Sequence, residues 1–94
     1  MAKKNPDFIK DNGNGTVAIT LSRPADVEGA KVAVLTMREP TVEDQLTTDE
    51  RQGSAAAKEI GLFADLCMVS PETIRKLPLR DYMRLQTGYG FFID

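Results

Sequence analysis

The sequence has 94 residues and a formal net charge of −2, with 41% hydrophobic and 28% charged residues. This length suggests one domain, and the slightly acidic balance argues against a nucleic-acid backbone as partner, since that requires clustered Lys and Arg. One cysteine excludes an intrachain disulfide and fits a reducing cytosol, and no apolar run approaches the roughly 18–20 residues that span a membrane.

Residues 1–15 are polar and end in the turn-forming run from Asp11 to Gly15. They lack the apolar stretch of a signal peptide. We predict a flexible N-terminal tail over residues 1–15 that can dock through Phe8, with plain terminal disorder as the alternative.

Residues 16–37 predict a β-hairpin. Apolar and polar residues alternate cleanly from Thr16 to Ser22, which is the period of a half-buried strand. The run from Lys31 to Met37 alternates less cleanly, which indicates burial or partner contact on both faces. Gly29 supplies a turn after Glu28, and Pro24 belongs at an edge or a bulge. An isolated hairpin is marginal in water, so helices should cover one face.

The next four residues predict a structural hinge between strand and helix: Arg38, Glu39, Pro40 and Thr41. A residue before proline is kept extended, and Thr41 is a natural N-cap. Asp44 follows three residues later, at the spacing of a capping box. We expect Arg38 and Glu39 to fix how the hairpin sits on the helices, through an ion pair or a cap.

Helices are predicted over about 42–51, 55–68, 71–76 and 79–91. The second has the strongest amphipathic stripe, and Gly61 within it indicates a closely packed neighbour. Ser70 and Pro71 form a helix start, and Pro78 separates the last two helices. The fold class is therefore α+β: an N-terminal β-hairpin followed by three to four short helices, in one small domain over residues 16–94.

No catalytic, metal-ligating or cofactor-binding residue is predicted. The chain has no histidine, which removes the usual general base and the commonest metal ligand. Cys67 lies on the apolar stripe of its helix and is expected to be buried. The acidic residues near the first helix are explained by capping and by a solvated face. We therefore expect a protein that is not an enzyme and needs no cofactor.

Apolar residues beyond the needs of a small core are candidate partner contacts. They include methionines and the C-terminal aromatic run, and the unclear second strand offers an edge for pairing with another copy. The candidate contact residues are Met37, Leu62, Met68, Tyr89, Phe91, Phe92 and Ile93.

The alternative function is a small DNA-binding or regulatory helical module built on residues 71–87. Four basic residues lie there, namely Arg75, Lys76, Arg80 and Arg84. Glu72 and Asp81 interrupt their charge, so nucleic acid is the less favoured partner.

Several runs of the sequence carry a family resemblance. In the first half they are Thr20-Leu21-Ser22-Arg23-Pro24, Glu28-Gly29 and Leu35-Thr36-Met37-Arg38-Glu39-Pro40-Thr41, and in the second half Phe63-Ala64-Asp65-Leu66-Cys67, Ser70-Pro71-Glu72 and the run from Leu77 to Gln86. In this order and spacing they resemble the Mu-like phage tail assembly chaperone family of contractile-tailed phages and prophages. The most specific pieces are the Arg-Glu-Pro-Thr hinge and the Leu-Arg-Asp-Tyr start of the last helix. Neither is a catalytic motif.

The resemblance implies a non-enzymatic chaperone that binds the tape measure protein and helps tail-tube subunits assemble around it. It implies action in the host cytoplasm and absence from the mature virion. It also implies a second, longer product made by a frameshift, with Phe91 to Ile93 at the junction.

Overall fold

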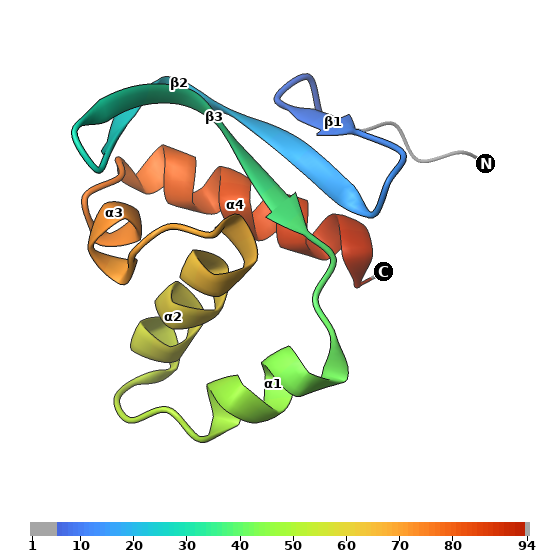
Figure 1. Ribbon diagram of the computed structural model, residues 1–94, viewed down its shortest axis with the longest axis vertical. Coiled ribbons are helices and arrows are strands. Elements are labelled where there is room, and N and C mark those ends of the chain that lie inside the picture. The colour runs from blue at the N-terminus through green and yellow to red at the C-terminus, as the bar shows by residue number, and fades with distance from the viewer. Residues whose placement is uncertain (1–5, 94) are drawn as a thin grey trace.

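The computed structural model describes residues 6–93 (Figure 1). Its sheet is antiparallel with the order β1-β2-β3, and four helices follow it in the chain. The elements are β1 (Ile9–Asp11), β2 (Thr16–Val27), β3 (Ala30–Arg38), α1 (Val42–Asp49), α2 (Ala55–Cys67), α3 (Pro71–Arg75) and α4 (Leu79–Phe92). The α+β class and the single small domain are confirmed. Among the described helices, none combines the length and apolar character needed to cross a bilayer.

The sheet has a third strand that the sequence did not predict. Ile9 of β1 lies opposite Ile19 of β2, and Asp11 lies opposite Val17. Residues 9–11 are therefore a strand within the segment expected to be a tail, whose residues 1–5 lie outside the described range. Only Ile9 in this strand is buried, so three residues gave no period-two pattern to detect.

The pairing of β2 with β3 is interrupted by a bulge. Thr20 pairs with Val34 and Ala25 pairs with Val32, so residues 21–24 of β2 face residue 33 of β3 alone. Pro24 lies in this bulge, as predicted, where its missing N–H breaks no ladder bond. The turn uses positive φ angles at Glu28 (51°) and Gly29 (87°), as in the hairpin turn that favours glycine.

The helices cover one face of the sheet in a fixed order. The helices α2, α3 and α4 contact the sheet, whereas α1 packs on α2 (Figure 1). A Cβ atom built on Gly88 of α4 would lie 2.6 Å from Ile19 Cδ1, so glycine allows α4 to approach β2 closely. Phe63 of α2 is fully buried, with its ring 5.7 Å from the rings of both Tyr82 and Tyr89.

The local helix signals are confirmed where they are strongest. Ser54 accepts a hydrogen bond from Ala57 N–H at 3.1 Å and caps α2, and Ser70 accepts one from Thr73 N–H at 3.2 Å ahead of α3. The predicted close neighbour of Gly61 is Arg51, whose guanidinium would meet a Cβ at this position at 2.6 Å. Gly61 thus makes room for the ion pair between Arg51 and Asp65.

Candidate interaction surface

The one cysteine belongs to the core. Cys67 is 7% exposed, and burial raises the pKa of its thiol to about 12. The thiol therefore stays protonated and unreactive near neutral pH. Within residues 6–93, no group of three or more potential metal ligands gathers in one place.

The predicted hinge is organised by Asp44. Arg38 donates to both its carboxylate oxygens, from Nη1 at 2.7 Å and from Nη2 at 2.8 Å. Thr41 Oγ1 accepts from the Asp44 N–H at 3.2 Å, and the Thr41 N–H donates to Asp44 Oδ2 at 2.8 Å, which completes the predicted capping box. These hydrogen bonds, above all those from Arg38, hold the pKa of Asp44 well below its usual range. Glu39 contributes its backbone N–H, which donates to the Gly15 carbonyl at 2.9 Å.

A second carboxylate joins α4 to the sheet. Asp81 is 0% exposed and accepts from the Ser22 N–H at 2.8 Å and from Ser22 Oγ at 3.0 Å. Arg84, one turn further along α4, donates to the Thr20 carbonyl at 2.8 Å and stacks 4.6 Å from the centre of the Phe8 ring. The sequence run that contains Ser22 and the run that contains Asp81 both carry the family resemblance. They therefore contact each other in the folded chain, and this contact is structural.

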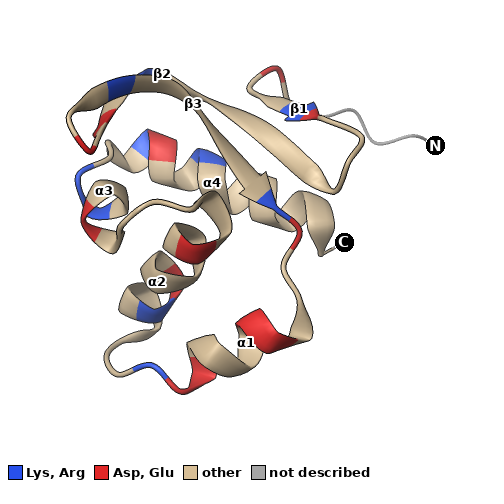
Figure 2. Cartoon of the chain, viewed as in Figure 1, with Lys and Arg blue, Asp and Glu red and all other residues tan. Residues whose placement is uncertain are grey.

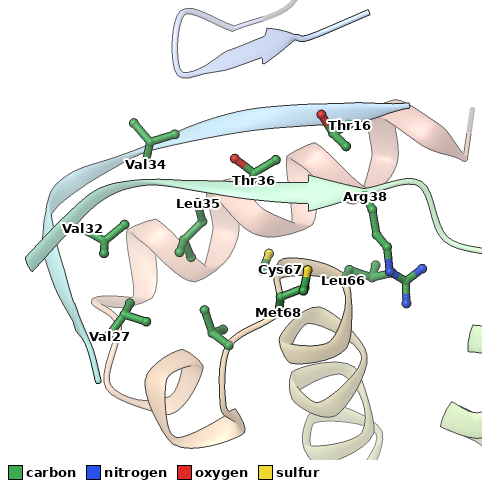
Figure 3. Close-up of a pocket in the computed structure, with 11 residues that line it drawn as sticks. Thr16, Val27, Val32, Val34, Leu35, Thr36, Arg38, Leu66, Cys67 and Met68 are labelled. Atoms are coloured by element: carbon green, nitrogen blue, oxygen red, sulfur yellow. The ribbon is translucent and has the colours of Figure 1, made fainter. Parts of the chain in front are cut away.

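An apolar groove follows the outer edge of β3 (Figure 3). It has a volume of about 340 Å³ and lies between β3 and the turn after α2. Its apolar lining residues are Val27, Val32, Val34, Leu35, Leu66, Cys67, Met68 and Val69. Met68 is 86% exposed and has φ 57° and ψ 43°, the left-handed conformation that glycine usually occupies after a helix. Because its side chain is exposed, Met68 is not stabilised by packing in the core of the single chain.

The C-terminal candidates form a second apolar patch. Phe91 and Phe92 are half-buried and contact each other edge to face, with ring centres 5.4 Å apart. Tyr89 packs against Phe63, while Ile93 keeps 54% of its surface exposed. We call Tyr89, Phe91, Phe92 and Ile93 the C-terminal patch.

Two sequence candidates lie in the core instead of on the surface. Met37 is 0% exposed, because it faces the helices from β3 opposite Val17, and Leu62 is 6% exposed within the stripe of α2. The structure also exposes large apolar residues that are absent from the predicted contacts: Val34, Val42, Leu46, Leu79 and Met83.

Four of these missed residues form pairs with helical spacing in the sequence. Val42 and Leu46 stand one turn apart, and so do Leu79 and Met83. Such spacing is typical of a buried helix face, so the sequence alone would place each pair in the core and not on the surface. In α4 the buried face is instead formed by Asp81, Leu85 and Gly88, a polar, an apolar and a small residue.

A family model described as "Phage tail assembly chaperone proteins, E, or 41 or 14" matches residues 18–94. No curated protein and no solved structure matches the chain. The match spans β2, β3 and all four helices, including the two contacts made by Asp44 and Asp81.

Proposed function

Since the chain belongs to this phage tail assembly chaperone family, we propose that it binds the tape measure protein and aids assembly of the tail-tube subunit around it. The family match over residues 18–94 carries this proposal. The role requires reversible contact and no catalysis, so we propose a non-enzymatic protein without a cofactor. We place its action in the host cytoplasm, before the virion is complete, and we expect it to be absent from the mature virion.

We propose the C-terminal patch as the client contact. An assembly chaperone must cover apolar client surface while that surface is exposed, so it needs apolar residues within reach of solvent. Ile93 is 54% exposed beside the half-buried pair Phe91 and Phe92. The half-buried rings supply broad, rigid contact area at low conformational cost.

Co-expression tests the function. The chain is produced together with the tape measure protein encoded in the same phage or prophage, and the soluble fraction of that client is compared with and without the chain. We expect higher client solubility and co-purification of the two proteins. If the client stays insoluble and the two proteins fail to co-purify, the chaperone proposal is wrong.

A matched pair of variants tests the surface. Ile93→Lys removes an exposed apolar group at a helix C-terminus, where a positive charge is tolerated. Leu46→Lys makes the same change near the C-terminus of α1, at a similar exposure of 52% against 54%. We expect Ile93→Lys to reduce co-purification several-fold and Leu46→Lys to leave it unchanged. Equal effects of the two variants would exclude the C-terminal patch as the contact.

Self-association is part of the same proposal. A client much longer than this chain presents many similar surfaces, and copies that pair can bind such a client with greater avidity. Paired copies also cover apolar surface that a single chain leaves open.

A further inference from the structure

One face of α4 is left uncovered by the rest of the described chain. The buried residues of this helix lie together on the other face, and they are Asp81, Leu85 and Gly88. The uncovered face carries exposed residues at alternating steps of four and three along the chain: Leu79, Met83, Gln86, Gly90 and Ile93. We call these five residues the α4 seam. Its three large apolar members, Leu79, Met83 and Ile93, are 71%, 55% and 54% exposed.

The spacing of the α4 seam is that of a helix–helix contact. Steps of four and three average about 3.5 residues, the repeat with which one α-helix keeps a single face towards another. With 14 residues, α4 is about 21 Å long and presents about two heptads. A Cβ atom added at Gly90 would meet nothing within 4 Å, so the seam is flat there and open to a neighbouring helix. A partner that follows the seam over its length is therefore expected to be a helix.

A groove beside the α4 seam can receive apolar side chains of such a helix. It has a volume of about 270 Å³ and is lined by Phe8, Arg80, Met83, Arg84 and Thr87. Of these residues only Phe8 lies outside α4, and Arg84 stacks on its ring at 4.6 Å from the centre. An apolar side chain placed between Met83 and Phe8 would be covered on two sides.

The charge beside the α4 seam is positive. Arg80 and Arg84 line the groove, and none of its lining residues is acidic. The acid of α4 is Asp81, which is fully buried and accepts hydrogen bonds from Ser22. Arg80 is exposed and takes no part in the ion pairs within residues 6–93. Figure 2 shows positive segments in the first half of α4, whereas α1 carries only acidic ones. A partner helix should therefore carry acidic residues beside its apolar stripe.

We propose that the α4 seam binds an amphipathic helix of the client, whose apolar residues follow a heptad spacing and whose flank is acidic. This inference rests on the proposed function, since a tail assembly chaperone needs a surface for another tail protein. Ile93 belongs both to the C-terminal patch and to the seam, so the client contact continues from that patch along α4. An acidic residue of the client helix faces Arg80.

Two helices of a second copy fit the α4 seam less well. The helix α1 has an acidic exposed face, but its 8 residues reach little more than half the length of α4. The α4 helix of a second copy has the full length, but it brings no exposed acid to Arg80. A client helix is therefore the occupant that satisfies length and charge together.

Synthetic peptides test the class of partner. Two peptides of about three heptads carry leucine at the core positions and differ only in their flanks, which are all glutamate or all lysine. We expect the glutamate peptide to bind the wild-type chain and to gain helicity in circular dichroism on binding. The lysine peptide should bind about two- to fivefold more weakly at low salt, and Arg80→Glu should exchange the two preferences. Equal binding of the two peptides would overturn the charge assignment, and binding of neither would overturn the helical partner.

A matched pair of variants tests the position of the contact. Met83→Gln removes an apolar group from the α4 seam, and Leu46→Gln makes the same change on α1 at a similar exposure of 52% against 55%. Met83→Gln should weaken binding of the glutamate peptide roughly tenfold, and Leu46→Gln should leave it unchanged. Both variants should keep the circular dichroism of the wild type, because both side chains are exposed. Equal losses in the two variants would overturn the seam as the contact.

Sedimentation equilibrium and co-expression separate this inference from its alternatives. A chain that binds neither peptide but forms a dimer of its 10.3 kDa mass, which Met83→Gln dissociates, would assign the seam to a second copy. A Met83→Gln variant that captures the tape measure protein as well as the wild type would overturn the seam and leave the proposed function standing. Binding of the glutamate peptide by a wild-type chain that captures no client would support the helix-binding seam and remove the proposed function.

Discussion

Asp44 and Asp81 make the same kind of contact in two different regions of the molecule. Each lies in the first turn of a helix and accepts hydrogen bonds from the end or bulge of a strand. The Asp44 side chain is 13% exposed and its partner Arg38 is 41% exposed, whereas Asp81 is fully buried. The first contact joins residues 6 apart, and the second joins residues 59 apart.

The difference shows how burial changes the importance of one carboxylate. Near the surface, water can replace Arg38 when the contact breaks, so the net contribution is small. Asp81 itself lies where water does not reach it and depends on its protein partners, although Ser22 is exposed in the bulge. Asp81 should therefore matter more to stability than the better-paired Asp44.

The largest expected effect is that of Asp81→Ala. This change removes both hydrogen bonds that the buried carboxylate accepts from Ser22, so we expect a loss of about 2–3 kcal/mol in the free energy of unfolding. Urea denaturation followed by circular dichroism measures it. Asp81→Asn keeps one acceptor oxygen and should lose less. A loss below about 1 kcal/mol for the alanine variant would show that burial does not distinguish the two carboxylates.

The next effect tests how closely α4 must approach the sheet beside Asp81. Gly88→Ala places a methyl group against the buried Ile19, so we expect a loss of about 1–3 kcal/mol by urea denaturation. Gly90→Ala is the control in the same helix, because a Cβ atom added there would meet no neighbouring element within 4 Å. That variant should gain roughly 0.5–1 kcal/mol from helix propensity. Losses of equal size at both positions would argue against close approach as the cause.

The smallest effect is that of Asp44→Asn, and it depends on pH. The folded state lowers the pKa of Asp44, so its contribution is present above the unfolded value of about 3.9 and is lost as pH falls further. We expect the variant to be less stable than wild type by about 1 kcal/mol at neutral pH. The difference should shrink steadily below about pH 4 in denaturation curves. A difference that stays constant down to about pH 2 would contradict this assignment.

The same contrast explains what could be predicted from the sequence. The capping box of Thr41 and Asp44, the turn at Glu28 and Gly29 and the starts of α2 and α3 depend on neighbouring residues, and all were predicted correctly. Local spacing carries such features because their partners lie within a few residues.

Long-range features escaped prediction. The partner of Asp81 lies in a bulge of β2, and no local pattern indicates that a first-turn acid is buried. The strand β1 exists because Ile9 fits beside Ile19, and Met37 enters the core because of the register of β3. The close approach of α4 to the sheet also depends on a distant residue, because Gly88 makes room for Ile19 of β2.

The 59-residue span between Ser22 and Asp81 has a consequence for synthesis of the chain. At roughly 5–20 residues per second, the ribosome needs roughly 3–12 s to make α4 after β2. During that interval the face of β2 that packs on Gly88 has no cover from α4. Final folding must wait for α4 to close this long loop, which makes the contact costly in entropy and late in time. A nascent chain of this protein is thus at risk of aggregation for several seconds before its own core can close.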